Sequence, residues 1–188
     1  MPCNNRDPTA AGSDSEGTAV NDNARTEPDF TTTDTEPAPG VTAVSDNAPS
    51  EPDSPPSGHC MCGGVSYEVH GPIRQVWNCH CWRCRRWTGH YMAGTGCKRS
   101  DLRFTSDATL AWHRPADDPN VAYGFCRECG GSVFWKVIDG PPDQTDHIAI
   151  CAGTLDLPTG LHTERALFVD DAADYHALDP AVTAWSRE

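Results

Sequence analysis

The sequence lacks long apolar runs, an export signal and an excess of basic residues. It contains no stretch of about 18 apolar residues, which excludes a membrane-spanning helix. Residues 1–16 have no basic start followed by an apolar segment, so we expect no secretory signal and a cytoplasmic protein whose thiols stay reduced. The 14 Lys and Arg residues are outnumbered by 27 Asp and Glu residues. Without a basic stripe, nucleic acid is not an expected partner. Without a long apolar run, a membrane is not expected either.

The first 57 residues also lack the side chains that build a hydrophobic core. Their large apolar residues, apart from Met1, are Val20, Phe30, Val41 and Val44. The segment carries 11 acidic and 2 basic residues, and a polar stretch at residues 19–29 returns at residues 43–53. Such a composition cannot bury enough apolar surface to fold. We therefore predict a disordered acidic tail over residues 1–57, rich in Pro, Thr, Ser and Asp with a duplicated segment, and a folded domain over residues 58–188.

Beyond the tail, the sequence is typical of short strands separated by Gly and Pro. Apolar and polar residues alternate in several segments, which is the pattern of strands with one buried face. The alternation occurs at residues 65–69, 110–113, 132–137 and 147–151. One helical turn is predicted over residues 82–88, because Gly89 provides a stop signal directly after it. We expect a mainly β domain.

Seven of the ten cysteines fall into three tight groups. The groups are Cys60 with Cys62, Cys79 with Cys81 and Cys84, and Cys126 with Cys129. This spacing is typical of zinc ligands. A disulfide framework is the alternative, but it requires an oxidising compartment. Cysteines two residues apart are also poorly placed to bridge each other.

The spacing divides the seven thiols into four and three. Cys60 and Cys62 project to the same face of an extended segment. Cys126 and Cys129 lie on a turn followed by two glycines, which permit positive φ. Together these two pairs make a closed four-thiolate site, the usual form of structural zinc. The middle group supplies three thiols, which predicts a metal site with one open coordination position. The alternative is a closed site in which Cys97 or a histidine is the fourth ligand.

Several linked motifs follow one another through the folded part. They are Cys-x-Cys, Cys-His-Cys-x-x-Cys-Arg-Arg-x-Thr-Gly, Gly-Phe-Cys-x-x-Cys-Gly, Phe-Trp, Ala-Gly-Thr-Leu-Asp and Phe-Val-Asp-Asp. In this order they resemble the glutathione-dependent formaldehyde-activating (GFA) family, which includes the centromere protein V type domain. The resemblance covers about residues 58–185. It implies a mainly β, Mss4-like zinc-binding fold of small coiled β-sheets.

The resemblance implies Zn²⁺ as the cofactor, with two ions per chain. It implies a structural zinc on Cys60, Cys62, Cys126 and Cys129, and a second zinc on Cys79, Cys81 and Cys84. The implied reaction joins glutathione and formaldehyde to S-hydroxymethylglutathione, formally as a carbon–sulfur lyase. The expected partners are therefore a small-molecule thiol and an aldehyde. An open three-thiolate site suits this chemistry, because a bound zinc lowers the pKa of an incoming thiol.

Basic and aromatic residues beside the middle cysteines are the candidates for substrate binding. Arg83, Arg85 and Arg86 belong to the predicted helical turn and stand near the open site. Their charge would favour a fourth thiolate, and a guanidinium pairs bidentately with the carboxylates of a glutathione-like tripeptide. A solvated basic turn is the alternative. His90 and Tyr91 follow the turn as further candidates for the pocket wall, with ordinary packing as the alternative.

A second function fits the same residues. In a non-catalytic zinc-binding module both metals would be structural, and the surface or the acidic tail would bind a protein partner. The two functions differ at the middle thiols, where a closed site favours the module and an open site favours the enzyme. His80 lies between two of these cysteines, and in an extended segment its side chain points away from a shared metal. The sequence leaves the oligomeric state open.

Deletion of residues 1–57 tests the predicted tail. Because this segment contributes no core, we expect the shortened protein to keep the melting temperature and the metal content of the full chain. Differential scanning calorimetry and metal quantification on both proteins measure this. A large drop in melting temperature would refute the assignment.

Overall fold

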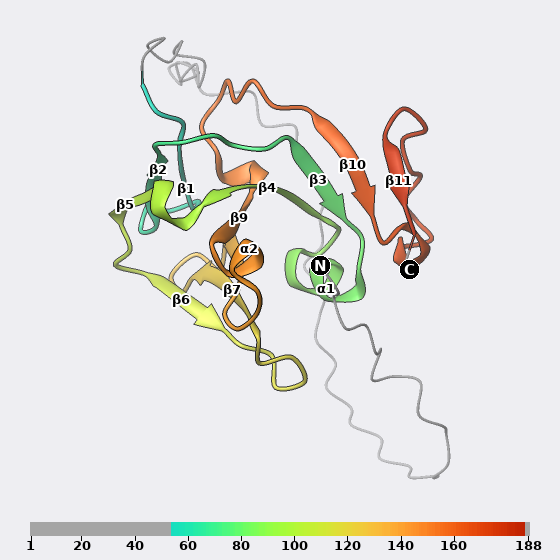
Figure 1. Ribbon diagram of the computed structural model, residues 1–188, viewed down its shortest axis with the longest axis horizontal. Helices are drawn as coiled ribbons and strands as arrows, with labels where there is room; N and C mark the ends of the chain where they lie inside the picture. Colours follow the sequence, from blue (N-terminus) through green and yellow to red (C-terminus); the bar gives the residue numbers. More distant parts are fainter. Residues whose placement is uncertain (1–53, 187–188) are drawn as a thin grey trace, which may run out of the picture. The chain divides into compact units, whose positions relative to one another are not determined.

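Two β-sheets form the framework of the described chain, residues 54–186 of the computed structural model (Figure 1). The smaller sheet has three strands in the order β1-β2-β5, and both of its strand pairs are antiparallel. Its strands are β1 (Ser57–His59), β2 (Ser66–Val69) and β5 (Leu102–Ser106). The predicted mainly β fold is confirmed.

The larger sheet has eight strands in the order β11-β10-β3-β4-β9-β8-β7-β6. Strand β10 runs parallel to both of its neighbours, β3 and β11, and the remaining pairs are antiparallel. From one edge to the other, the strands are β11 (Thr183–Trp185), β10 (Thr163–Leu167), β3 (Val76–Cys79), β4 (Met92–Lys98), β9 (His147–Cys151), β8 (Ser132–Val137), β7 (Val121–Cys126) and β6 (Leu110–His113).

Short helical segments connect the strands within the described residues. They are the α-helices α1 (Trp82–Thr88) and α2 (Pro142–Thr145), and the 3-10 turns η1 (Arg99–Asp101), η2 (Ala152–Thr154) and η3 (Val169–Asp171). In the part of the chain that the structure describes, none of these helices has the length and apolar character needed to cross a membrane.

The segments with alternating apolar residues are strands β2, β6, β8 and β9, and the predicted helical turn is α1. Strand β4 lacks this signal, because four consecutive residues in it are buried and two of them are Gly94 and Gly96. Glycine weakens a strand and carries no side chain that would mark a face. Helix α2 is also absent from the sequence prediction. It has only four residues and begins at Pro142, whose fixed φ suits a first helical position.

Helix α1 turns the chain from β3 into β4 (Figure 1). It ends at Gly89, which has a φ of 81° and donates its N–H to the Arg85 carbonyl oxygen. Glycine adopts this left-handed conformation without steric cost. Arg85 and Arg86 lie in the last turn, where basic side chains complement the helix dipole. Cys81 is the N-cap residue and Cys84 lies in the first turn, so the start of the helix determines where both thiols lie.

The main core lies between the small sheet and strands β4, β7, β8 and β9 of the large sheet. Tyr67 is 1% exposed, and its ring meets that of Phe134 edge-on at 5.1 Å between centroids. Its hydroxyl forms a hydrogen bond of 2.7 Å with Thr154 Oγ1, and burial raises the pKa of Tyr67. A buried ring with a satisfied hydroxyl therefore joins the two sheets. The core also contains Cys60, Val65, Val69, Cys97, Cys126, Val133, Ile148, Ile150 and Leu155.

Strand β1 begins before residue 58, the first residue of the predicted folded domain. Ser57 pairs with Glu68 in the small sheet, and the Val69 N–H donates to the Pro56 carbonyl oxygen at 2.8 Å. Removal of residues 1–57 therefore takes away part of a strand. The expectation of an unchanged melting temperature is accordingly corrected to a truncation after residue 53, which keeps β1 whole. The remainder of the predicted tail lies outside the described residues.

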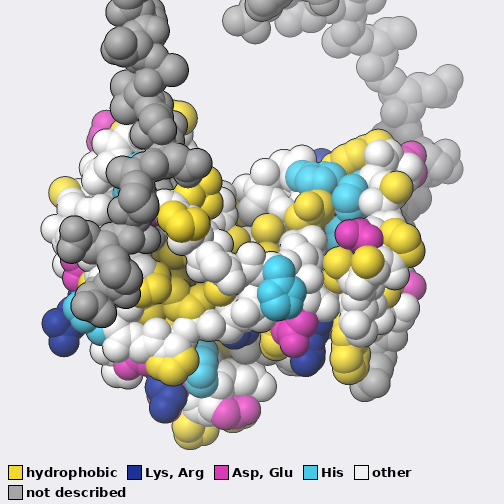
Figure 2. Space-filling view, turned by 90° about the horizontal axis from the view of Figure 1, so that it is seen from above, with side chains coloured by type: hydrophobic (Ala, Val, Ile, Leu, Met, Phe, Trp, Pro, Cys, Tyr) yellow, Lys and Arg dark blue, Asp and Glu magenta, His cyan; other side chains and the backbone are white. Residues whose placement is uncertain are grey.

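Acidic and basic side chains are mixed on the face of the molecule that Figure 2 draws. Hydrophobic side chains gather there in a hollow, and charged and histidine side chains lie around it. Residues 58–188 carry 16 acidic and 12 basic residues, so most of the net negative charge of the chain belongs to the preceding residues.

Substitution of Gly58 tests the packing between the sheets. A Cβ at this position would lie 2.5 Å from the Tyr67 hydroxyl oxygen and closer still to the Thr154 carbonyl oxygen. Because neither group moves away easily, we expect Gly58→Ala to lower the free energy of unfolding by about 1–3 kcal/mol. Gly153→Ala is the matched control, since a Cβ there has no neighbour within 4 Å. Urea denaturation measures both variants, and equal stabilities would contradict the packing argument.

Candidate metal centres and the groove beside them

Four cysteines from two distant segments meet beside the main core. Cys60 and Cys62 lie on the turn between β1 and β2. Cys126 ends β7, and Cys129 lies on the turn that leads into β8. The four Sγ atoms all lie within 4.8 Å of one another. Cys60 and Cys126 are buried, whereas Cys62 is exposed. The structure brings together the four thiols that the sequence analysis grouped into a closed site.

Both turns that carry these cysteines contain a glycine with positive φ. Gly63 has a φ of 75° and donates its N–H to the Cys60 carbonyl oxygen at 2.9 Å. Gly130 has a φ of 72° and donates to the Cys126 carbonyl oxygen at 2.9 Å. The Val65 N–H also points at Cys60 Sγ, at 3.3 Å. The two turns thus have similar local structures, which present sulfurs and backbone N–H groups on the same side.

Hydrogen bonds to sulfur favour the thiolate forms of the second pair. The pKa of Cys126 falls to about 6, first because of the Thr109 hydroxyl, 3.0 Å from its sulfur, and then because of the backbone N–H groups of Cys129 and Glu128. The pKa of Cys129 is also lowered, mainly by the backbone N–H of Gly131. Thiolate is the form that binds a metal ion. The lowered pKa values of Cys126 and Cys129 therefore favour the binding of a cation at this turn.

The spacing of the sulfurs fits zinc. Sγ of Cys62 lies 3.6 Å from Sγ of Cys60 and 3.6 Å from Sγ of Cys126. Four sulfurs at zinc–sulfur distances of about 2.3 Å in a tetrahedron are separated by about 3.8 Å. The backbone N–H of Gly64 lowers the pKa of Cys62, but the contacts with Cys126 and Cys60 raise it, to about 12. Because crowded sulfurs resist ionisation together, a central cation is what would stabilise all four thiolates.

Three cysteines at the junction of β3 and α1 form a second cluster. Cys79 ends β3, Cys81 is the N-cap residue of α1, and Cys84 lies in the first helical turn. Their Sγ atoms lie within 4.8 Å of one another. Cys81 and Cys84 are buried, and Cys79 is half-buried. Cys81 and Cys84 thus lie at the helix start, where backbone N–H groups have no partner within the helix.

The second cluster has three donors. Within residues 54–186, no other cysteine, histidine or carboxylate places a ligand atom in this group. Cys97, the alternative fourth ligand, lies in the main core. Cys151 packs against Cys81 and Cys84 without joining the donor group, and burial raises its pKa to about 12. Three thiols are the number of protein donors at zinc sites that keep one position open.

A groove of about 1180 Å³ passes the second cluster. Cys79 and Cys84 are part of its lining, together with Met92, Trp135 and Phe168, which pack against the cluster. Phe168 has a φ of 56°. Such a φ is an outlier for a bulky residue, and backbone strain of this kind occurs most often at functional sites. The groove therefore gives a ligand access to Cys79 and Cys84, two of the three thiols.

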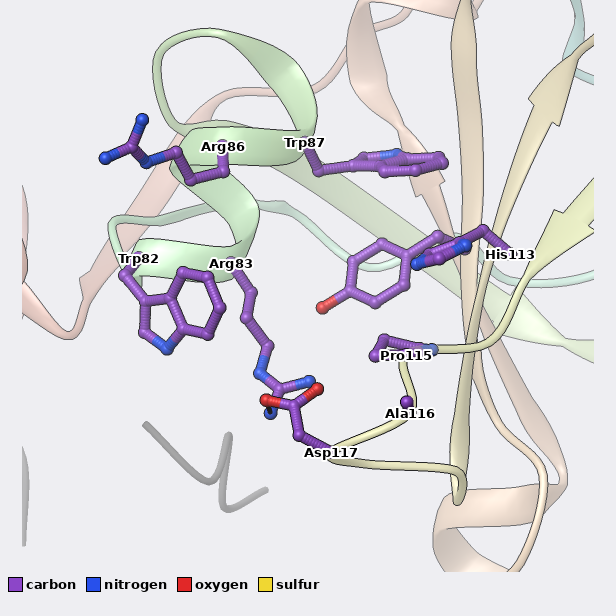
Figure 3. Close-up of a pocket in the computed structure, with 9 residues that line it drawn as sticks. Trp82, Arg83, Arg86, Trp87, His113, Pro115, Ala116 and Asp117 are labelled. Carbon is purple, nitrogen blue, oxygen red and sulfur yellow. Dashed lines mark hydrogen bonds and ion pairs between the residues drawn. The ribbon is translucent and has the colours of Figure 1, made fainter. Parts of the chain in front are cut away.

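Arg83 and Arg86 lie in a separate cavity of about 300 Å³, beside α1 (Figure 3). The Arg83 side chain is 6% exposed, and its Nη2 lies 2.7 Å from Asp117 Oδ2. Its Nη1 lies 3.9 Å from Asp118 Oδ2. Figure 3 shows Arg83 reaching toward Asp117 while Arg86 extends away from it. The two carboxylates offset the charge of Arg83, which is directed into this cavity and not into the groove.

Arg85, the third arginine of α1, lies four residues after Cys81 and so on the same side of the helix. It is half-buried and lines neither the groove nor the cavity of Figure 3. Its Nε atom is buried, and the described residues offer it no hydrogen-bond partner. None of the three arginines predicted for substrate binding lines the groove.

The histidines near the second cluster belong to a group of stacked rings. His80 is 3% exposed, with its ring 5.0 Å from that of Tyr91 and 5.3 Å from that of His176. Burial lowers the pKa of His80, and His176 and His90 lower it further. His90 lies 4.3 Å from Tyr91 between ring centroids and contacts the Tyr175 hydroxyl at 3.3 Å. His90 and Tyr91 pack in this group and do not line the groove.

Sequence reasoning missed several residues that surround the two clusters. Thr109 contacts Cys126 from 17 residues away, and no local pattern marks it. Phe168 was visible only as a member of the Phe-Val-Asp-Asp motif, whereas Trp135, like the other tryptophans, was predicted to be a core or pocket-wall residue. Arg74 and Met92 line the groove without any signal in the sequence, because their roles depend on the pairing of distant strands.

A comparison with family models shows which family the chain belongs to. A family model described as glutathione-dependent formaldehyde-activating enzyme matches residues 55–171, which include all seven clustered cysteines. No curated protein matches the chain. The chain is similar to a crystal structure of a Rhodobacter sphaeroides protein, a Northeast Structural Genomics target, with 20% sequence identity and a TM-score of 0.44. That similarity covers 69% of this chain and 99% of the other. The chain belongs to the glutathione-dependent formaldehyde-activating enzyme family.

Proposed function

We propose that the chain is a zinc-dependent carbon–sulfur lyase of the GFA type, which joins a thiol such as glutathione to formaldehyde or another small aldehyde. The observation that supports the proposal is a cluster of three thiols beside a groove. A ligand in the groove contacts Cys79 and Cys84, which belong to its lining. Membership of the family supports the same class of reaction.

The two clusters have different roles in this proposal. The closed set of Cys60, Cys62, Cys126 and Cys129 would hold a structural zinc inside the main core. The set of Cys79, Cys81 and Cys84 would hold the second zinc next to the groove. When bound there, zinc would supply a positive charge that lowers the pKa of an incoming thiol.

The surrounding side chains position the thiol and keep water away from it. Met92, Trp135 and Phe168 enclose the second cluster with apolar atoms. Electrostatic interactions are stronger in such surroundings than in water. The N–H groups at the start of α1 add a favourable field for negative sulfur, because Cys81 occupies the N-cap position of this helix.

The proposed reaction is an addition without net oxidation or reduction. A bond forms between the thiol sulfur and the carbonyl carbon of the aldehyde, and the π bond of the carbonyl group breaks. The proton that the thiol loses is gained by the carbonyl oxygen, which becomes a hydroxyl. The product is a hydroxyalkyl thioether, and no further reactant is required.

Substitutions in the two clusters separate their roles. Because Cys60 belongs to the main core and to the four-thiol cluster, we expect Cys60→Ser to remove more than about 5 kcal/mol of folding free energy and to unfold the domain. Cys81→Ser should cost less than about 3 kcal/mol and abolish thiol binding. Circular dichroism melts and calorimetric titration with glutathione measure both effects. Equal loss of structure in the two variants would contradict the division of roles.

X-ray absorption at the zinc edge tests the proposed open position. We expect two zinc ions per chain and about 3.5 sulfur ligands per zinc, rising toward four when glutathione is added. The Cys81→Ser variant is the control, because its second site has lost a ligand. A spectrum that shows four ligands per metal and does not change with glutathione would contradict the open position and the proposed enzymatic function. It would favour a structural zinc module with a protein partner.

A further inference from the structure

Charged groups in the groove are few, and their charges balance. The lining contains the basic side chains Arg74 and Lys98 and the acidic side chains Asp101 and Asp143, together with His147. Glutathione carries two carboxylates and an ammonium group. Burying these groups is unfavourable unless each meets a partner. The arginines of α1, which the sequence analysis offered as those partners, do not line the groove.

The Arg74 guanidinium is already engaged by the protein. Its Nη1 donates to the carbonyl oxygens of Gln75 and Gly94 at 2.9 and 2.8 Å, and its Nη2 donates to the Thr95 carbonyl oxygen at 3.2 Å. Its Cζ lies 4.1 Å from the ring centroid of Trp77. Burial lowers the pKa of Arg74 to about 10, which leaves it protonated at neutral pH. Arg74 therefore supports the groove wall and is not presented to a carboxylate.

The middle of the groove floor has little side-chain volume. Met92, Gly94 and Gly96 alternate along β4 and line the groove, and Ala149 of β9 pairs with Gly96. A Cβ at Gly94 would have Met92 Cε at 3.4 Å and Arg74 Nη2 at 3.9 Å among its nearest neighbours. Both of these residues line the groove, so a side chain at Gly94 would project into it. The glycines leave this space to a ligand.

Indole rings form the walls around this floor. Trp77, Trp135 and Trp185 all line the groove. Trp185 belongs to β11, which lies beyond the residues that match the family. The guanidinium of Arg165 connects two of the rings, at 4.9 Å from the Trp77 centroid and 5.5 Å from the Trp185 centroid. Aromatic walls favour ligands that remove apolar surface from water.

We infer that the groove selects a thiol with an apolar body, such as an arylalkyl or alkyl thiol, over a tripeptide with charged ends. The inference rests on the proposed function in one respect, that the thiol sulfur lies at Cys79 and Cys84. The groove of about 1180 Å³ is larger than most small-molecule sites, which occupy roughly 300–1,000 Å³. A bulky apolar body fills this space, and its burial supplies the binding free energy.

Calorimetric titration of the zinc-loaded full chain tests the inference with three ligands. Phenylmethanethiol has an apolar body and a thiol, glutathione has charged ends and a thiol, and phenylmethanol has the same ring without a thiol. We expect phenylmethanethiol to bind at least about tenfold more tightly than glutathione. Phenylmethanol should bind more weakly than phenylmethanethiol, because it shares only the groove contacts.

Variants of the groove locate the binding. Gly94→Leu places a side chain on the floor, and we expect it to weaken phenylmethanethiol binding at least about tenfold. Trp185→Ala removes part of a wall and should act in the same direction. Trp185 is 48% exposed on an edge strand, so this variant keeps the fold. Gly153→Leu is the matched control, since a Cβ at this exposed glycine has no neighbour within 4 Å, and it should leave all three affinities unchanged.

The outcomes separate this inference from the proposed function. If glutathione binds as tightly as phenylmethanethiol, the inference is overturned, and the proposed function stands whenever glutathione also raises the sulfur count at zinc. Unchanged phenylmethanethiol affinity in both groove variants would overturn the inference as well. Equal affinities for phenylmethanethiol and phenylmethanol, both weakened by Trp185→Ala, would support the apolar selectivity of the groove and contradict thiol activation.

Discussion

The contact between the Cys60 turn and the Cys126 turn connects the small sheet to the large one. These turns lie 64 residues or more apart in sequence, and a third segment joins them where the Thr109 hydroxyl reaches Cys126 Sγ. The Thr109 carbonyl oxygen in the same segment accepts a hydrogen bond from the Arg127 N–H. Each strand has only three to seven residues and so buries little apolar surface by itself. A domain of this size therefore benefits from a cluster that joins three segments at one point. Because the unfolded chain lacks such a site, the free energy of metal binding adds to the free energy of folding.

Helix α1 stands between two environments, although it has only seven residues. Because an α-helix has 3.6 residues per turn, Cys81 and Cys84 face the second cluster while Arg83 and Trp87 face the cavity on the other side. There Trp87 stacks on His113 with 5.9 Å between ring centroids, and Arg83 pairs with Asp117. These contacts fix the rotation of the helix about its axis. Arg83, which the sequence predicts as a substrate-binding residue, thus pairs with Asp117 on the cavity side of the helix.

Local chemistry was predictable from the sequence, and long-range geometry was not. The two cysteine sets, the alternating strands and the end of α1 at Gly89 all follow from patterns that span a few residues. The partner of Arg83 lies 34 residues away on a loop without a motif, so the direction of that side chain depends on tertiary packing. Likewise, no pattern announces that Phe168 adopts positive φ or that the glycines of β4 form the floor of a groove.

The position of β11 has a consequence for the order in which the site is assembled. All seven clustered cysteines precede residue 130. The groove wall that contains Trp185 is supplied by β11, which is the last strand within residues 54–186. Pairing of β11 with β10, in the register that sets Leu167 opposite Trp185, completes that wall. During synthesis both sets of thiols therefore leave the ribosome before the groove wall that contains Trp185 has been made. A protease that cuts between β10 and β11 would likewise separate the ligand wall from the metal donors and leave every cysteine in place.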